Sequence, residues 1–275
     1  MTESDSNAPF SFVDLPATRS TQKPRRKGLT MVADFGLPLR YAEDLFDLAG
    51  RYIDLMKIAV GTSRLYDGAT LRRKLALYRE RGARAFLGGQ FQEYVYATYG
   101  TKALPRFLEE ARRVGFETIE ISDNCVPLSD AERREQIRLA RDCGLAVFGE
   151  VGSKDAKTGA SLLIAQAEVC FTAGCELVLV EAAELMERGE PNRALIAQLS
   201  SAIDFSKVLI ELPGPWISGV TLSAIEDMKK FLVREFGPDV NIANVLPNDV
   251  METEALRVGL GVVGPSPRAA RKVHI

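Results

Sequence analysis

The amino-acid sequence predicts a single α/β domain, a (β/α)8 barrel of the TIM type. Short apolar runs with β-branched residues alternate with longer amphipathic segments from Gly28 onward, which is typical of a parallel sheet covered by helices. Eight such units can be placed in the chain of 275 residues, and barrels of this kind typically have about 250. A doubly wound open sheet is the alternative. It would be expected to carry GxGxxG after its first strand, where this chain has DFGLPLR.

The predicted strands are short runs of apolar residues, many of them β-branched, and a polar or glycine residue follows most of them. In chain order they are Leu29–Ala33, Ile53–Ala59, Ala83–Leu87, Thr118–Ile121, Ala146–Gly149, Leu177–Val180, Val208–Ile210 and Asn241–Ala243.

The predicted helices lie between these strands, where apolar residues recur at spacings of three and four. Several of them stop at a glycine, which suits the left-handed residue that follows many helices. In chain order the helices are Tyr41–Ala49, Leu71–Arg81, Ala103–Val114, Asp130–Cys143, Ser161–Ala173, Arg193–Ile203, Leu222–Phe236 and a last one from about Pro247 to Val258.

The two ends of the chain differ in composition from the barrel, which we place at residues 27–261. Residues 1–26 are rich in Ser, Thr, Asn and Pro and show no sustained periodicity, so we expect a flexible N-terminal arm. Residues 262–275 form a basic C-terminal tail that holds the single histidine, His274.

The charge balance argues against two classes of partner. With 35 Lys+Arg, 37 Asp+Glu and a net charge of −2, the chain has no general attraction to nucleic acid or to anionic membranes. No run of about 18 apolar residues occurs and the first residues do not resemble a secretory signal, so we expect a cytoplasmic protein. The expected partners are a small-molecule substrate and further copies of the chain, since barrels often associate through apolar helix faces.

Acidic residues stand at the ends of most predicted strands. The carboxyl ends of barrel strands meet at one mouth, where unpaired acids are costly unless they ligate a metal. Oxygen ligands without imidazole or thiolate favour Mg²⁺ or Mn²⁺. The candidate ligands are Glu150, Glu181 and Glu211, and the competitors are Asp34 and Glu120. Each acid taken singly can instead cap a helix or pair with a lysine.

Any catalysis must use carboxylates, lysines, hydroxyls or a hard metal ion, because the only histidine lies in the tail. Lys57 lies in the second strand and Lys154 in the loop after the fifth; either can stabilise a carbanion or move a proton, with Glu120 or Asp34 as base. Lys57 can also form a Schiff base or act only as a counter-ion. The residues expected to contact substrate are Phe35, Gly89, Gln90, Ser122, Asp123 and Asn244.

A set of motifs resembles the phosphosulfolactate synthase family over roughly Lys27 to Gly261. The motifs are KGLTMVADFG, YIDLMKIAVGTS, FLGGQ, GFETIEISDN, GEVGSKD, LVLVEAAE and VNIANV, in this order. The resemblance implies a (β/α)8 barrel and a Mg²⁺-dependent reaction that joins sulfite to phosphoenolpyruvate on the route to coenzyme M. It also implies that Lys154 is the lysine suggested as proton donor to an enolate-like intermediate.

Several cations typical of the family are missing. Phe35 replaces the lysine of a DKG motif, Ala183 stands in the EGRES motif where an arginine is usual, and Ser153 replaces the first lysine of EVGKK. The arginines of RRGLRGDT are also reduced, since the chain has RVGLGVVG from Arg257. Compact anions need guanidinium or ammonium groups to replace water. A diverged lyase with a less anionic substrate is therefore expected.

Three functions follow. The first is a metal-dependent carbon–carbon lyase that passes through an enolate or related carbanion, for example a retro-aldol release of formaldehyde from a hydroxymethyl-bearing aromatic compound. The second is an authentic phosphosulfolactate synthase whose anions are held by other cations, such as Arg25, Arg26, Lys27 or Arg64. The third is a non-catalytic relative, since plant heat-stress proteins also resemble this family.

Overall fold

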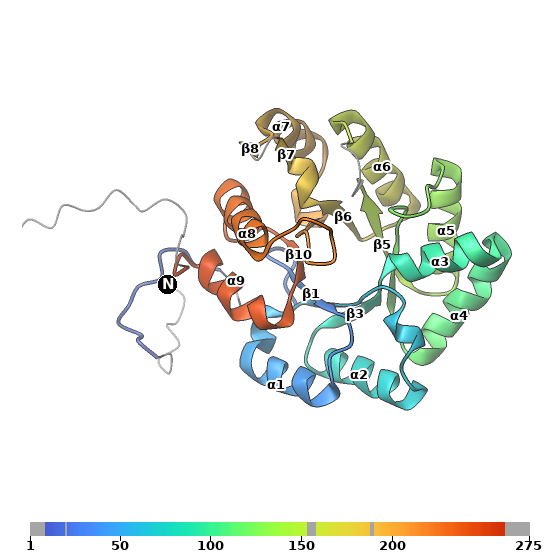
Figure 1. Ribbon diagram of the computed structural model, residues 1–275, viewed down its shortest axis with the longest axis horizontal. Coiled ribbons are helices and arrows are strands. Elements are labelled where there is room, and N and C mark those ends of the chain that lie inside the picture. Colours follow the sequence, from blue (N-terminus) through green and yellow to red (C-terminus); the bar gives the residue numbers. More distant parts are fainter. Residues whose placement is uncertain (1–8, 20, 153–157, 188–189, 262–275) are drawn as a thin grey trace, which may run out of the picture.

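The protein forms a closed barrel of parallel strands with helices on its outside (Figure 1). The structure is a computed structural model and describes residues 9–19, 21–152, 158–187 and 190–261. Around the barrel the strands follow the order β1-β10-β9-β6-β5-β4-β3-β2. The predicted (β/α)8 architecture is thereby confirmed. None of the described helices is both long and apolar enough to cross a membrane.

The barrel strands coincide closely with the predicted runs. Their bounds are β1 Thr30–Asp34, β2 Leu55–Ile58, β3 Arg84–Leu87, β4 Thr118–Ile121, β5 Ala146–Val151, β6 Leu177–Glu181, β9 Val208–Glu211 and β10 Ile242–Val245. Two further short strands, β7 Met186–Glu187 and β8 Glu190–Pro191, pair antiparallel outside the barrel. The prediction misses this pair because two-residue strands leave no periodicity.

The helices also follow the predicted segments, with one addition. Their bounds are α1 Leu39–Ala49, α2 Gly68–Glu80, α3 Gly89–Tyr99, α4 Leu104–Val114, α5 Asp130–Asp142, α6 Ala160–Ala173, α7 Arg193–Ala202, α8 Leu222–Phe236 and α9 Val250–Arg257. Helix α3 is absent from the prediction. Glycines in the left-handed conformation follow α4 and α6, at Gly115 and Gly174, but Gly50 after α1 is right-handed with φ −56°.

Successive residues of each strand face opposite sides of the sheet, and the two sides have separate apolar cores. The outer core lies between strands and helices and takes alternate strand residues such as Val32, Ile119 and Val178. The inner core fills the barrel with Leu29, Met31, Leu55, Phe86, Phe148, Leu177, Leu179, Leu209 and Ala243. This alternation along each strand decides which side chains at the strand ends can reach the barrel interior.

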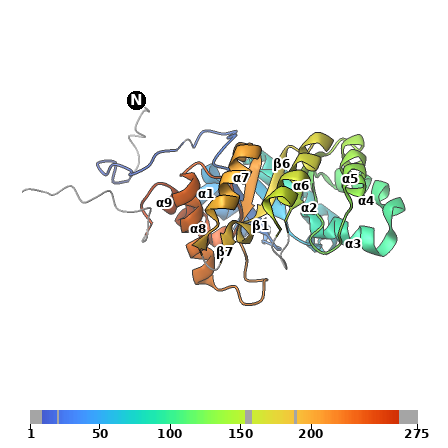
Figure 2. The ribbon, with the colours of Figure 1, turned by 90° about the horizontal axis from the view of Figure 1, so that it is seen from above.

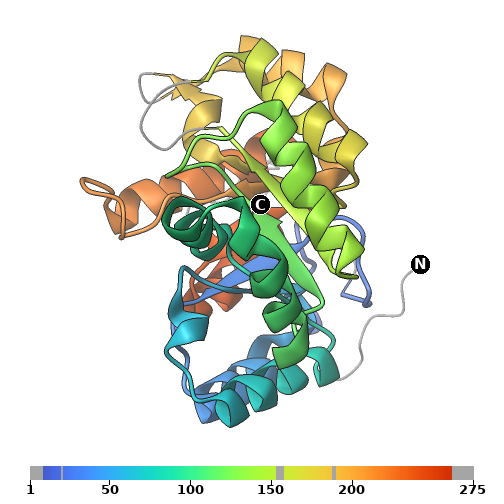
Figure 3. The ribbon, with the colours of Figure 1, turned by 90° about the vertical axis from the view of Figure 1, so that its right-hand side faces the viewer.

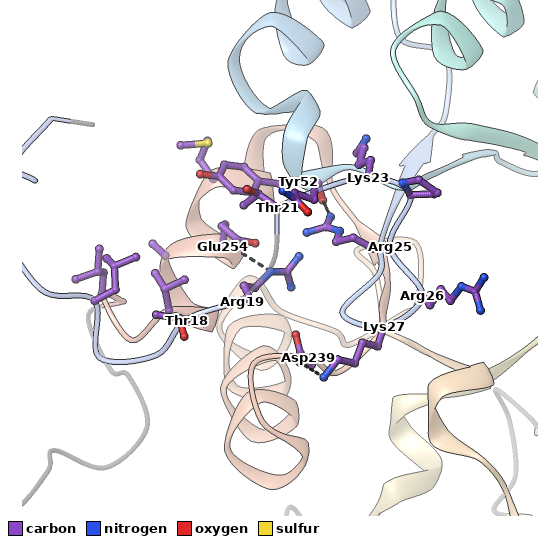
Figure 4. A pocket seen from close by; sticks show the side chains of 17 residues that line it. Thr18, Arg19, Thr21, Lys23, Arg25, Arg26, Lys27, Tyr52, Asp239 and Glu254 are labelled. Carbon is purple, nitrogen blue, oxygen red and sulfur yellow. Dashed lines mark hydrogen bonds and ion pairs between the residues drawn. The ribbon is translucent and has the colours of Figure 1, made fainter. Parts of the chain in front are cut away.

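The segment before β1 lies on the face opposite the long loop between β9 and α8, as Figures 2 and 3 show. It lines a cavity of about 1210 Å³ together with α9 (Figure 4). There Arg19 pairs with Glu254 at 3.1 Å and Arg25 pairs with Asp54 at 2.6 Å, all four side chains being buried. Both arginines fall within the predicted arm. The division into arm, barrel and tail stays a prediction, and the tail lies outside the described residues.

Arg257, the last residue of α9, joins the two strands that close the barrel. Its side chain is fully buried and donates hydrogen bonds to the carbonyl oxygens of Pro238 at 2.8 Å and Val240 at 2.6 Å, just before β10. It also donates to the carbonyl oxygen of Leu29 at 3.3 Å, just before β1. Burial, followed by the neighbouring Arg19, lowers the pKa of Arg257 to about 9.

Candidate active site

Lys57 lies at the centre of a group of acidic side chains inside the barrel. Its Nζ is 2.9 Å from Glu120 of β4 and 3.0 Å from Glu211 of β9. The lysine comes from β2, so these ion pairs cross the interior from three separate strands. Each of these residues stands two positions beyond an interior residue, Leu55, Thr118 or Leu209, and therefore faces inward.

Glu150 of β5 completes a cluster of three buried carboxylates. Ligand oxygens of Glu120, Glu150 and Glu211 lie within 4.8 Å of one another. Burial lowers the pKa of Lys57, but Glu120, Glu211 and Glu150 outweigh it, so its pKa lies well above the ordinary 10.5. The amine is therefore held as an ammonium ion, which disfavours the Schiff-base alternative because that chemistry needs the neutral amine.

The charges in this cluster fit a divalent cation. Three buried carboxylates that offer oxygens within 4.8 Å of one another are costly to bring together unless cations balance them, and a bound divalent ion supplies such balance beside the Lys57 ammonium group. A donor set made of carboxylate oxygens suits Mg²⁺ or Mn²⁺. The residues that fit the ion best are Glu120, Glu150 and Glu211.

Glu181, the remaining predicted ligand, is not part of this cluster of described residues. It is buried at the end of β6, and its Cα pairs in register with that of Glu211 on the neighbouring strand. The structure thus brings Glu150 and Glu211 together as predicted, with Glu120, a predicted competitor and base, as the third member.

Asp34 lies outside the barrel interior, on the side of Val32 and the outer core. Its fully buried carboxylate pairs with Lys74 at 2.6 Å and accepts a hydrogen bond from the hydroxyl of Tyr78 at 2.7 Å, both on α2. Burial and Asp34 together raise the pKa of Tyr78. The structure therefore places Asp34, a predicted competitor ligand and base, between β1 and α2 and not among the cluster residues.

Helix α3 positions Glu120 through its first residue. The backbone N–H of Gly89 donates to Glu120 at 3.0 Å, and a Cβ built on Gly89 would lie 2.3 Å from Oγ of Ser122. Only glycine allows this approach. Two predicted substrate contacts, Gly89 and Ser122, thus pack against each other, and the hydroxyl of Ser122 donates to Glu93.

Glu93 is a structural residue that the sequence interpretation missed. Its carboxylate accepts backbone hydrogen bonds from Cys125 at 2.6 Å and Val126 at 2.8 Å, and so holds the loop after β4. It is buried on α3, and its detection from sequence would have required that helix to be recognised. Gln90 beside it is half-buried and lies 3.7 Å from Sγ of Cys125.

Arg133 and Asn124 support Glu150. The guanidinium of Arg133 donates to the backbone oxygen of Glu150 at 3.0 Å and pairs with the carboxylate of Asp123, a predicted substrate contact. The side-chain amide of Asn124 donates to the Glu150 carboxylate. Asn244, at the end of β10, has φ 59° and donates to the carbonyl oxygen of Leu212 at 3.3 Å.

An aromatic pair stands over the same end of the barrel. Phe35 follows β1, Trp216 lies in the loop after β9, and their ring centroids are 4.8 Å apart. The two residues are 42% and 41% exposed, so part of this aromatic surface is open to solvent. Phe35 was a predicted contact and Trp216, the single tryptophan, was not. Lys154 lies outside the described residues.

The sequence is similar to known proteins of one family. The family model of (2R)-phospho-3-sulfolactate synthase (ComA) matches residues 18–262. The chain is 30% identical to the phosphosulfolactate synthase of Methanocaldococcus jannaschii over 246 residues, which are 86% of this chain and 92% of that protein. It is also 30% identical to the phosphosulfolactate synthase of Bacillus subtilis over 256 residues, 87% of this chain and 93% of that protein.

A plant protein is a more distant relative. The chain is 22% identical to Protein HEAT-STRESS-ASSOCIATED 32 of Arabidopsis thaliana over 264 residues, which are 86% of this chain and 87% of that protein. The resemblance indicated by the sequence motifs is confirmed by the family model, which spans the whole barrel. The chain is therefore a member of the (2R)-phospho-3-sulfolactate synthase (ComA) family.

Proposed function

We propose that the chain is a Mg²⁺- or Mn²⁺-dependent carbon–carbon lyase whose reaction passes through an enolate or related carbanion. The observation that carries the proposal is the buried cluster of Glu120, Glu150 and Glu211 around Lys57. The three carboxylates would hold the ion. When bound, the ion would polarise a substrate oxygen and stabilise negative charge on it.

The protein side chains have separate roles in the proposed reaction. Lys57 is an ammonium ion held by two carboxylates, so it supplies fixed positive charge next to a developing carbanion and needs no reorganisation. Glu120 would have two roles: one carboxylate oxygen would hold the ion, and the other would act as the base that takes the proton of a substrate hydroxyl. The bond between the hydroxyl-bearing carbon and its neighbour, a carbon alpha to a carbonyl group, then breaks; an aldehyde leaves, and the electron pair remains as the enolate of that carbonyl. Lys154 is the proposed donor that returns a proton to carbon.

The proposed substrate is a hydroxymethyl-bearing aromatic compound, with formaldehyde as the aldehyde released. The support is a loss of cations together with a gain of aromatic surface. Phe35 stands where the family typically has lysine, and its ring meets that of Trp216 at 4.8 Å. Aromatic rings bind other rings in offset or edge-to-face arrangements, whereas they offer little to phosphate or sulfite.

Identity to two phosphosulfolactate synthases supports a second candidate, addition of sulfite to phosphoenolpyruvate. The cations proposed as replacements weigh against it. Arg25 precedes β1, is buried and pairs with Asp54, and Arg26 and Lys27 line the same cavity at the amino ends of the strands. Of the proposed cations, Arg64 alone lies beyond the carboxyl end of its strand, just after β2. A non-catalytic role, the third candidate, gives no reason for three carboxylates to be buried with oxygens within 4.8 Å of one another.

The test combines product analysis with metal binding. Purified protein with Mg²⁺ is incubated with phosphoenolpyruvate and sulfite, and separately with hydroxymethyl aromatic compounds; phosphosulfolactate is measured by mass spectrometry and formaldehyde by a colorimetric assay. We expect formaldehyde and no phosphosulfolactate, and loss of turnover in Lys154→Ala. The opposite pair of results would establish the second candidate.

Metal binding is measured on Glu150→Gln and Glu211→Gln, with Glu117→Gln as the control because that side chain is 59% exposed and remote from the cluster. In the wild type and the control, Mn²⁺ at a hundredfold excess over its Kd should raise the stability by about 2.7 kcal/mol. In the two cluster variants this rise should vanish. A rise of equal size in all four proteins would show that the cluster is not the metal site.

A further inference from the structure

A second concave site lies in the helical layer between α2 and α4, which are neighbours around the barrel in Figure 1. This α2–α4 cleft has a volume of about 670 Å³. Small-molecule sites in proteins typically measure roughly 300 to 1,000 Å³ and are lined mostly by apolar side chains. The cleft is on the outer side of the sheet, so it is separate from the carboxylate cluster inside the barrel.

Its walls are apolar and partly aromatic. Phe91 of α3 and Phe107 of α4 are half-buried and meet edge to face, with ring centroids 5.1 Å apart. Beneath them the cleft reaches buried core residues, among them Leu71, Leu87 and Phe116. Water against such walls is less favourable than an apolar ligand, because burial of apolar surface gains about 25 cal/mol per Å².

Its rim carries four guanidinium groups against one carboxylate, that of Glu110. Arg64 precedes α2, Arg72 lies on α2 and Arg106 on α4, so cations come from both walls. No carboxylate among the described residues forms an ion pair with any of these three side chains. The fourth rim arginine, Arg113, pairs with Glu110 at 2.6 Å. Glu110 also interacts electrostatically with Arg106. An apolar interior under this excess of cations favours a ligand with an apolar body and an anionic head.

We propose that the α2–α4 cleft binds a small molecule of that class, an aryl or acyl compound with a carboxylate or sulfonate head. The apolar body packs between the Phe91 and Phe107 walls, and the head accepts hydrogen bonds from the rim guanidinium groups, which match planar oxyanions well. The site does not depend on the lyase reaction proposed above, since it shares none of the cluster residues.

Binding is tested with anilinonaphthalene sulfonate, an aromatic anion whose fluorescence increases in apolar surroundings. We expect saturable binding of about one molecule per chain, displaced by dodecanoate but not by dodecanol, which lacks the anionic head. Arg72→Glu and Arg106→Glu should each weaken binding by about tenfold, the value of one charge-assisted contact. Arg234→Glu is the matched control, because Arg234 is an exposed arginine on α8 outside the cleft.

A filling variant supplies independent evidence. Ala103→Trp places an indole at the cleft wall and should abolish probe binding while circular dichroism and the melting temperature stay near wild type. Unchanged binding in both charge variants would overturn the proposal, whether or not the Trp variant folds. So would light scattering that shows wild-type oligomers dissociating in Ala103→Trp, because the cleft would then be covered by a second copy of the chain.

Discussion

Lys57 is the residue on which the buried charges of the interior depend. It has 13% of its side chain exposed, while the Glu120 and Glu211 side chains that it contacts have 0%. Removal of one member of a buried ion pair leaves an uncompensated charge and typically costs about 3–5 kcal/mol. Lys57→Met should lower the free energy of unfolding by that amount in urea titrations, while Lys102→Met, at an exposed lysine, should be neutral.

The pH dependence of this loss follows from the raised pKa of Lys57. A lysine whose folded pKa is raised contributes stability that is fully present below its unfolded pKa and is lost only as pH rises through the folded value. The difference between wild type and Lys57→Met should therefore stay constant from about pH 7 to 9. A difference that grows with pH across this range would show that Lys57 is neutral in the folded protein, because the unfolded chain would then bind one proton more.

The sequence predicted which polar residues stand at the strand ends, but not whether each side chain faces the barrel interior or the surrounding helices. Lys57, Glu150 and Glu211 were singled out because polar residues stand at strand ends, and they do meet. Asp34 carries the same signal and faces α2 instead. Side chains alternate between the inner and outer face of a strand, so a shift of one position decides which face a residue takes. A short apolar run does not show which of its residues face inward.

At the scale of elements, helix α3 shows what the sequence could not indicate. Its sequence, GQFQEYVYATY, begins with glycine and contains aromatic and β-branched residues, which have modest helix propensity. Tertiary contacts stabilise it instead, among them those of Glu93 with the loop after β4. Strands and the remaining helices were predictable because each carries its own apolar pattern, whereas α3 depends on a distant loop.

The segment before β1 gives a prediction about pH. Lys23 donates hydrogen bonds to the carbonyl oxygens of Ile53 and of Gly82, and burial lowers its pKa to about 8 from 10.5, against the opposing effect of Asp54. Between these values the unfolded chain binds more protons than the folded one, so stability rises with pH.

The size of the rise is modest because Lys23 is only partly buried and solvent screens its charge. From pH 8 to 10 the wild type should gain about 1 kcal/mol relative to Lys23→Gln, which cannot titrate. Parallel denaturant titrations at the two pH values measure the gain. Equal pH dependence of the two proteins would contradict a lysine buried against these carbonyl groups.

At the scale of the whole molecule, Arg257 stabilises the closure of the barrel. It donates to carbonyl oxygens before β10 and before β1, the last and first strands. Loss of these bonds leaves buried acceptors unpaired, at roughly 1–3 kcal/mol each, offset in part because a buried charge is removed.

Arg257→Met should therefore cost about 2 kcal/mol. Hydrogen exchange should speed up in peptides that cover β1 and β10 more than in those that cover β5, on the far side of the barrel. Arg234→Met, at an exposed arginine, is the control. If hydrogen exchange instead became faster by the same factor in all strands, Arg257 would stabilise the fold as a whole and not the pairing of β1 with β10 in particular.

The architecture itself was the most predictable feature. Regular alternation of apolar runs and amphipathic segments is a property of the whole chain, so an error in one element, such as the missing α3, leaves the barrel prediction intact. The carboxylate cluster was less predictable because it requires distant strand ends to be compared in space.

The apolar interior directly below the cluster has a consequence for the order of events in turnover. Phe86, Phe148 and Leu209 belong to a buried layer under Lys57 and the carboxylates, so this end of the interior is a closed floor. In the proposed reaction, substrate and products would therefore reach the cluster from the carboxyl ends of the strands. When a reaction gives a small and a large product, the product nearer the floor cannot leave before the one above it. Product release should therefore be ordered.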